Sequence, residues 1–389
     1  MSGLGIDFGT STTLAAIGQG PAAEAGGVSP TPIVVRLPSG DEIVPSFVAF
    51  APDGQVLVGR DARGRRVIDP VNTLHAFKRI LGRPWLAAEV RAFGRSYPFQ
   101  LSCGADNLPR FTTRAGQVTA AEVATYLLAY LREAPQVAAH PAVTMTVPVT
   151  ARAEQRAALV SAALGAGFQR VGLVDEPCAA ALAALKDDPR EQVTVVYDLG
   201  GGTFDCTVLH WQPPRYRVLA LAGDSYLGGD DITLRLAIWV AERILETHRW
   251  NVRTNVSSWQ RLLLACDQLK AALSMHPSQT LNLGLIDEVL VGHSLTVPRA
   301  ELERLCMDLV QRTFLICDEA LRQAGRNVHR VQSLVLSGGC CHMPLIQQSV
   351  RSYFGKEPRL QLSPDRLVAL GAAAIASGAA AIPMGSPSH

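Results

Sequence analysis

Residues 195–205 run Val195-Val196-Tyr197-Asp198-Leu199-Gly200-Gly201-Gly202-Thr203-Phe204-Asp205, which predicts a strand, a glycine turn and a returning strand. Three successive glycines let the backbone approach a ligand closely, and their amides can point at an anion. An aspartate beside a phosphate needs a cation between them, so Asp198 indicates Mg²⁺, which proteins hold through carboxylates, water and substrate phosphates. Taken alone, the turn is equally compatible with a purely structural hairpin.

A second hairpin of the same kind lies near the N-terminus, where residues 5–13 run Gly-Ile-Asp-Phe-Gly-Thr-Ser-Thr-Thr. Again an aspartate, Asp7, ends an apolar strand, glycine turns the chain and hydroxyls follow. Two such hairpins about half a chain apart predict a duplicated lobe with a phosphate held between the copies. Neither fits the Gly-x-x-x-x-Gly-Lys-Ser/Thr or Gly-x-Gly-x-x-Gly pattern, which disfavours those nucleotide-binding classes.

The composition sets the broad class. A chain of 389 residues with 48% apolar and 18% charged residues is globular and long enough for two or more lobes. The net charge of +2 gives no electrostatic reason to expect nucleic acid or an anionic membrane. No apolar run approaches the ~18 residues that span a bilayer. The N-terminus enters a strand with no cleavable leader, so we expect a cytoplasmic protein.

The eight cysteines fit that compartment. None is spaced as Cys-x-x-Cys, and most lie in apolar periodic stretches, which favours buried free thiols over a zinc site. Cys340 and Cys341 are adjacent, and we expect plain small residues there rather than a redox switch.

The rest of the chain alternates predicted strands and helices. Thr119 and Glu122 form a capping-box pattern ahead of an amphipathic helix. Residues from about 231 to 330 are predicted to be mostly helical, with a β patch over 280–297, which indicates a subdomain inserted into a second lobe. The other predicted elements are strands over 33–36, 43–50, 55–58, 143–147, 171–174 and 333–337, and helices over 151–164, 176–185 and 367–376.

The order of these motifs resembles the ATPase domain of the DnaK-type, seventy-kilodalton heat-shock chaperones, within the actin and hexokinase superfamily. The resemblance runs from about residue 3 to residue 378. Its motifs are the two phosphate hairpins at 5–10 and 198–205, the connecting helices at 174–181 and 370–374, and the adenosine motif at 336–339. Three further stretches, 72–83, 146–148 and 222–231, separate this family from actin and from the sugar kinases.

The resemblance implies a two-lobed, actin-like α/β ATPase fold. Each lobe would be a ribonuclease-H-like mixed sheet flanked by helices, with inserted subdomains. We expect lobe I over 1–180, lobe II over 181–378 with its insert over 231–330, and a flexible tail over 379–389. The family continues into a linker, a peptide-binding β-sandwich and a helical lid, none of which we expect in this chain.

The resemblance also assigns chemistry to particular residues. Lys78 would orient the attacking water and contact the γ-phosphate, with Glu176 as a carboxylate that positions water or links to Mg²⁺. Asp7 and Asp198 would hold Mg²⁺ through its water shell, with Asp205 in the outer shell. Without the resemblance, Lys78 is an ordinary solvated lysine and Glu176 a helix cap. The implied catalytic residues are Lys78, Glu176, Asp198, Thr203 and Asp7.

The nucleotide itself, ATP or ADP, would be held by a larger set of backbone and side-chain groups. Pro148 and Arg156 match a pair that relays nucleotide state in the family. Many family members have an arginine where Ala271 stands, and the arginine of the family's Gly-Gly-x-x-Arg motif is His342 here. Losing cation–π stacking on adenine predicts looser binding of the nucleotide. The implied nucleotide-binding residues are Gly9, Thr10, Ser11, Thr12, Gly200, Gly201, Gly202, Gly228, Gly229, Asp267, Lys270, Ser274, Gly338, Gly339, His342 and Asp365.

These features leave two functions to distinguish. The first is a slow ATPase whose nucleotide-driven conformational change acts on a partner protein. The alternative is an ATP-bound, chaperone-like regulator or scaffold with negligible turnover, and a filament-forming ATPase is a weaker third. We expect a monomer whose partners are a nucleotide and a co-chaperone, an exchange factor or a separate client-binding protein.

Overall fold

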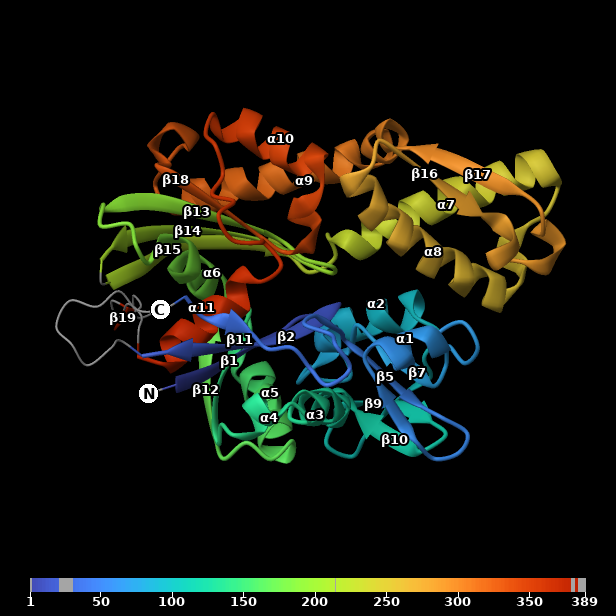
Figure 1. Ribbon diagram of the computed structural model, residues 1–389, viewed down its shortest axis with the longest axis horizontal. Coiled ribbons are helices and arrows are strands. Elements are labelled where there is room, and N and C mark those ends of the chain that lie inside the picture. The colour runs from blue at the N-terminus through green and yellow to red at the C-terminus, as the bar shows by residue number, and fades with distance from the viewer. Residues whose placement is uncertain (1, 21–30, 214, 379–381, 384–389) are drawn as a thin grey trace.

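The computed structural model describes residues 2–20, 31–213, 215–378 and 382–383 and has two lobes, each built on one large sheet. Figure 1 shows the N-terminal lobe below and the second lobe above, each with an inserted part at the right. Of the predicted tail, 379–381 and 384–389 lie outside the described residues, and Ile382–Pro383 form the short strand β19.

The two large sheets share one connection pattern. The first has the order β12-β11-β1-β2-β3, with β4 also paired to β2; the second has the order β18-β13-β14-β15-β19. In each sheet, two antiparallel strands form a hairpin, and a further strand pairs in parallel with the first strand of that hairpin. The strands are β1 (Ser2–Phe8), β2 (Thr12–Gln19), β3 (Ile33–Val34), β4 (Val44–Pro45), β11 (Ala142–Val147), β12 (Arg170–Asp175), β13 (Gln192–Leu199), β14 (Phe204–Gln212), β15 (Arg215–Asp224) and β18 (Ser333–Ser337).

This repetition places the two aspartates in equivalent positions. Asp7 is the penultimate residue of β1 and pairs with Leu14 of β2. Asp198 is the penultimate residue of β13 and pairs with Asp205 of β14. The duplicated lobe predicted from the two glycine hairpins is therefore confirmed at the level of strand order.

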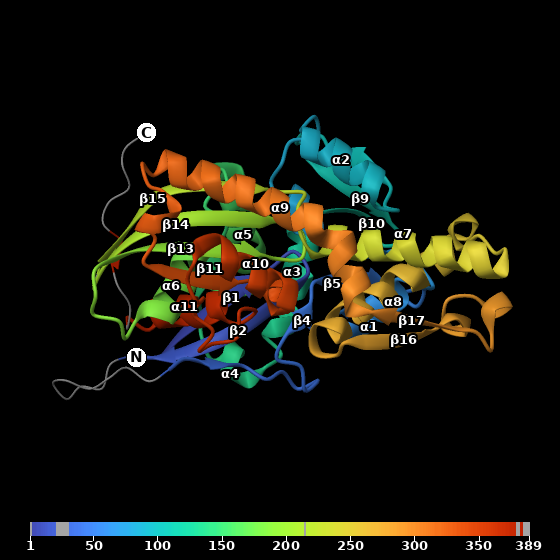
Figure 2. The ribbon, with the colours of Figure 1, turned by 90° about the horizontal axis from the view of Figure 1, so that it is seen from above.

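Helices cover the outer faces of the sheets. The capping box of Thr119 and Glu122 is present at the start of α3, as predicted. Figure 2 shows α9 lying along the strands of the second sheet. The flanking helices are α3 (Ala120–Leu131), α4 (Pro135–Ala138), α5 (Ala153–Gly165), α9 (Arg299–Gln323) and α10 (Pro344–Phe354).

Two helices of small residues join the lobes. Helices α6 (Glu176–Leu185) and α11 (Leu367–Ala376) pack on each other and form, with residues of both sheets, a buried cluster of their own. Their contact is backbone to backbone, because a Cβ on Gly371 would lie 1.8 Å from the carbonyl oxygen of Ala179. A Cβ on Gly5 of β1 would lie 2.2 Å from the amide of Ala373. The predicted helix over 367–376 is confirmed.

Each lobe carries an insert. The second lobe's insert contains two long helices and a hairpin. Helix α9 falls within the range 231–330 expected for the insert, but it packs on β14 and β15 of the second sheet. The strand predicted over 43–50 is divided in the first lobe, because Ser46 turns to donate its hydroxyl to the carbonyl oxygen of Gly9. The insert elements are β5 (Phe47–Phe50), β6 (Val56–Val58), α1 (Arg60–Arg65), β7 (Thr73–His75), η1 (Phe77–Ile80), α2 (Ala88–Ser96), β8 (Leu101–Cys103), β9 (Pro109–Thr113), β10 (Gly116–Thr119), α7 (Gly229–His248), α8 (Val256–Met275), β16 (Ser278–Asn282) and β17 (Ser294–Pro298).

Candidate functional site

The two glycine hairpins meet face to face between the lobes. A Cβ on Gly201 would lie 1.9 Å from the hydroxyl oxygen of Ser11, so only glycine permits this approach. Gly338, at φ +88°, brings the end of β18 against the backbone of Leu199. Both hairpins and this third turn line one cavity of about 90 Å³, which also has Lys78, Glu176 and Asp365 in its wall. The predicted phosphate-end residues are therefore brought together.

Lys78 reaches this cavity from a single turn of 3₁₀ helix. Ala76, just before that turn, has the left-handed φ of 54°, a conformation that a residue with a Cβ adopts only under tertiary constraint. Phe77 and Ile80 are buried and anchor the turn in the core of the first lobe. The ammonium of Lys78 then donates to Glu176, 2.7 Å away, at the start of α6.

Three partly buried carboxyl groups surround this ion pair. Asp7 accepts a hydrogen bond of 3.0 Å from the hydroxyl of Thr146. Asp198 accepts one of 3.0 Å from the hydroxyl of Ser337. Asp205 faces Asp198 across the β13–β14 hairpin. One ammonium thus stands among four acidic side chains.

Burial, together with the excess of negative charge, shifts the pKa values of the aspartates upward. Burial first, and repulsion from Glu176 second, raise the pKa of Asp198 to about 8, that of Asp205 to about 7 and that of Asp7 to about 6. Burial alone would lower the pKa of Lys78, but attraction to Glu176 and Asp7 outweighs it and raises that pKa. The lysine is therefore a permanent cation, and the site favours a further one.

The donor set fits a hydrated Mg²⁺ ion. Within the described residues, no three His, Cys, Asp or Glu side chains gather closely enough to ligate an ion directly. Mg²⁺ gives up its water reluctantly and is usually held through water by one or two carboxylates and substrate phosphates. Asp7 and Asp198, at equivalent ends of the two hairpins, match that mode of binding.

The raised pKa values predict a loss of stability with rising pH in the metal-free protein. Unfolded aspartates have a pKa near 3.9, so up to about pH 8 the folded chain binds more protons and its unfolding free energy falls as pH rises. We expect a lower thermal midpoint at pH 8 than at pH 7 in chelator, and a smaller difference with Mg²⁺ and ADP. In Asp198→Asn the fall should shrink; a fall as steep as in the unmodified chain would contradict this assignment.

A larger cavity, of about 700 Å³, continues from the hairpins between the two inserts. Its wall contains the predicted nucleoside residues Asp267, Lys270, Ser274 and His342. Lys270 donates to the carbonyl oxygen of Gly229 at 2.9 Å and pairs with Asp267 at 3.0 Å. Both side chains thus help to fix the start of α7 and the wall of the cavity.

Two departures from the family pattern lie in the same wall. Ala271 is exposed at the cavity and presents no group that could stack on a base. His342 lies 3.3 Å from Asp365, and hydrogen bonding to that carboxylate raises the pKa of the histidine. A guanidinium is therefore absent from both predicted stacking positions.

Arginines of the first lobe bridge the cavity to the second, a feature that sequence analysis missed. Arg63 of α1 lies 2.5 Å from Asp267 of α8. The Nε of Arg66 donates to the side-chain oxygen of Gln260 at 2.8 Å. These partners are about 200 residues apart in the chain, so no local pattern links them. They hold the inserts of the two lobes together.

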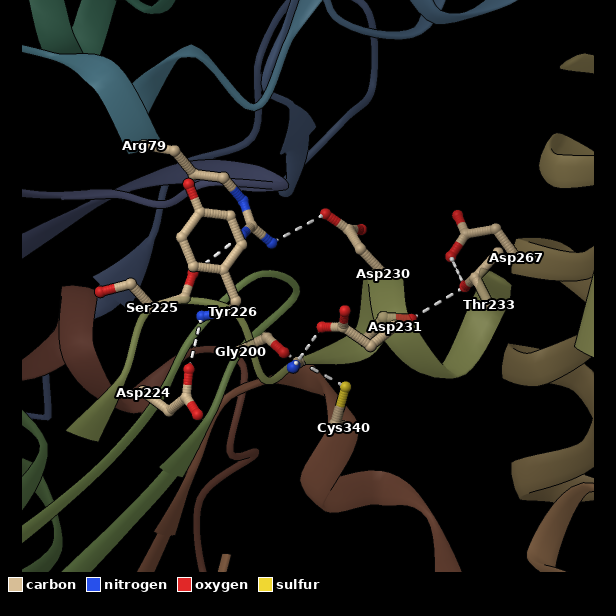
Figure 3. A network of polar contacts seen from close by, with 12 residues as sticks. Arg79, Gly200, Asp224, Ser225, Tyr226, Asp230, Asp231, Thr233, Asp267 and Cys340 are labelled. Carbon is tan, nitrogen blue, oxygen red and sulfur yellow. Dashed lines mark hydrogen bonds and ion pairs between the residues drawn. The ribbon is translucent and has the colours of Figure 1, made fainter. Parts of the chain in front are cut away.

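A second bridge, between Arg79 and Tyr226, lies beside the phosphate hairpins. Figure 3 shows the guanidinium of Arg79 beside the ring of Tyr226, at 5.1 Å from its centroid. Arg79 donates to the carbonyl oxygen of Ser225 at 2.7 Å and lies 3.5 Å from Asp230. Tyr226 in turn donates to the carbonyl oxygen of Glu89 in the first lobe at 2.9 Å. Each lobe thus sends one side chain across the boundary.

The predicted relay residues also lie together. Arg156 pairs with Asp175 at 2.6 Å, directly before Glu176, and approaches the carbonyl oxygen of Pro148 at 3.5 Å. Arg156 therefore contacts the residue directly before Glu176.

The cysteines are free thiols, and all except Cys103 are buried. The Sγ of Cys340 donates to the carbonyl oxygen of Gly200 at 3.3 Å, and burial raises the pKa of this thiol to about 11. Burial also raises the pKa of Cys341. Both therefore remain protonated near neutral pH, where the thiolate is the reactive form.

The chain also matches a known protein family. A family model described as Hsp70 protein matches residues 3–382, nearly the whole chain. Over the described ranges, none of the helices combines the length and apolar character needed to cross a bilayer.

Proposed function

Because the chain belongs to the Hsp70 protein family, we propose that it uses ATP binding and hydrolysis as a conformational switch that acts on a partner protein. The family consists of chaperone-type proteins that bind and hydrolyse ATP with Mg²⁺. The observation that carries the proposal is the Lys78–Glu176 pair, enclosed with Asp7 and Asp198 between two glycine hairpins.

The side chains have separate roles in this proposal. Lys78 stays protonated, so it positions water and the terminal phosphate as a donor and cannot act as a base. Glu176 fixes the direction of the ammonium through their 2.7 Å contact. Asp7 and Asp198 would hold Mg²⁺ through water, and that ion neutralises phosphate charge when bound. Thr203 and the glycine amides of the hairpins bind phosphate oxygens.

The bridges between the lobes support the switch. The lobes share α6 and α11 at one end, whereas polar side chains join the inserts at the other. A nucleotide bound between the inserts can therefore shift the equilibrium between states in which these polar contacts are formed and states in which they are broken. Hydrogen exchange with ATP and with ADP tests this: we expect the protection of α1 and α8 to differ between the two nucleotides, and equal protection would argue against a switch.

The bridge between Arg63 and Asp267 yields a kinetic prediction. Arg63→Gln removes an ion pair that is partly exposed, and such pairs contribute up to about 1 kcal/mol. We expect ADP to dissociate about two- to fivefold faster, measured by stopped flow with a fluorescent ADP. Arg36→Gln, which breaks an exposed ion pair with Glu42 within one lobe, is the matched control and should leave the rate unchanged. Equal rates in both variants would exclude a role in nucleotide release.

The altered nucleoside wall favours a second candidate, an ATP-bound regulator with negligible turnover. Ala271 and His342 supply no guanidinium to stack on the base, so nucleotide occupancy depends more on the phosphate end. Single-turnover hydrolysis by the purified chain separates the two functions. Cleavage of bound ATP supports the switch, and stable binding without cleavage supports the regulator.

Restoring the missing stacking group is expected to tighten nucleotide binding. Ala271→Arg places a guanidinium at an exposed position of the cavity wall, where cation–π contact contributes on the order of 1 kcal/mol. Titration calorimetry should show an ADP Kd lower by roughly five- to tenfold. Ala271→Gln, which adds a shorter polar side chain without charge, should give a smaller gain, and an equal gain would mean that stacking is not responsible.

A further inference from the structure

A small cavity, here called the rear cavity, lies directly behind the phosphate site. Its volume is about 70 Å³. Thr10, Lys78 and Thr203 line both this cavity and the phosphate cavity, so they form the wall between the two. The residues proposed to hold the terminal phosphate are therefore also the boundary of a second compartment.

The size of the rear cavity limits what it can hold. A water molecule needs about 10–15 Å³ of cavity volume. The rear cavity, at about 70 Å³, therefore has room for roughly five waters or one small ion. A nucleoside belongs in the cavity of about 700 Å³ on the other side of the hairpins. Arg79 and Tyr226 line both the rear cavity and this larger one, and their cation–π contact closes the border between them.

The chemistry of the lining favours an oxyanion. Lys78, Arg79 and Arg83 contribute cationic donors, Glu89 and Asp205 contribute carboxylates, and threonine hydroxyls add neutral donors. The carboxylate of Glu89 is already neutralised by Arg83, at 2.6 Å. Asp205 is the second acidic group, so the five charged side chains of the lining, three cations and two carboxylates, carry a net charge of +1. Arginine and lysine together with hydroxyl donors are the groups that bind phosphate.

From these observations we propose that the rear cavity is an exit site for the inorganic phosphate cleaved from ATP. The phosphate passes between Lys78 and Thr203 while ADP stays in the larger cavity, so its release does not require the lobes to open. The inference rests on the proposed ATP hydrolysis and adds a separate route for one product.

Filling the rear cavity tests the route. Ala151 lies in its wall, outside the proposed catalytic and nucleotide-binding residues, so Ala151→Phe reduces its volume. In single turnover, we expect phosphate release, followed with a fluorescent phosphate-binding sensor, to slow by about tenfold or more, a barrier increase of about 1.4 kcal/mol. ATP cleavage, followed by acid quench, and ADP release should stay within twofold. Ala139→Phe, at an exposed alanine elsewhere in the same lobe, is the control.

A second variant tests the ligand. Arg83→Gln removes a charged donor, and a charge-assisted hydrogen bond supports a roughly tenfold or greater weakening of binding. Inorganic phosphate is titrated into the ADP-loaded protein, and Arg83→Lys should recover much of the affinity. Arg91→Gln, whose exposed guanidinium contacts the carbonyl oxygen of Leu86, should leave the affinity unchanged.

The outcomes are distinct. Slower phosphate release with normal cleavage supports the exit site. Slower cleavage with unchanged release overturns it and makes the rear cavity a source of water, and no change in either also overturns it. If the unmodified chain cleaves no ATP, the proposed function fails; phosphate binding that depends on Arg83 would then still support the site, and its absence would refute it.

Discussion

Replacing Lys78 by alanine should reduce single-turnover ATP hydrolysis by about a hundredfold or more while leaving the ADP affinity within a few-fold. The ammonium is held at 2.7 Å from Glu176 in a buried site, where a preorganised donor contributes most to a developing phosphate charge. ADP lacks the terminal phosphate that Lys78 is proposed to contact, so its binding depends on the other groups of the site. Acid-quench measurement of cleavage and calorimetry with ADP test the two halves of this prediction.

Two further variants separate catalysis from folding. Lys78→Ala leaves Glu176 buried without its partner, which is destabilising in itself, so the double variant with Glu176→Gln removes both charges and should remain inactive. Lys356→Ala changes a lysine outside the lining of the phosphate cavity and should have normal activity. Full turnover in Lys78→Ala would remove this residue from the site.

Replacing Gly371 by alanine is expected to destabilise the protein by about 3 kcal/mol or more, the largest stability effect that we predict. A Cβ there would lie 1.8 Å from the carbonyl oxygen of Ala179 on the neighbouring helix. Backbone atoms cannot move aside as a flexible side chain does, so α6 and α11 must separate, and overpacking of this kind costs at least about 1–3 kcal/mol. Because these two helices join the lobes, nucleotide binding should weaken as well.

Urea denaturation measures this effect against a matched control. Gly64 lies inside α1, and a Cβ on it would meet no heavy atom within 4 Å. Gly64→Ala should therefore stabilise the protein by about 0.5–1 kcal/mol, the ordinary gain from a better helix former. A midpoint for Gly371→Ala equal to that of the unmodified chain would mean that the two helices can part without cost.

The secondary structure was largely predictable because it depends on local patterns. The capping box at Thr119, the alanine-rich helix after Asp175 and the strand before Gly338 all follow from residues close together in the chain. The insert of the first lobe was harder, because its strands are three to five residues long. Strands this short carry too little alternation to be recognised.

The sequence by itself determined the two phosphate hairpins, their duplication and the family, because aspartate, glycine and hydroxyl in a fixed order leave few alternatives for the backbone. Only the tertiary structure decided how Lys78 meets Glu176, 98 positions away, and how Arg79 and Tyr226 close the boundary between the lobes. Such contacts depend on the relative position of the two sheets, which the close packing of α6 against α11 sets. The rear cavity is the space left by that arrangement, and no local pattern in the chain specifies it.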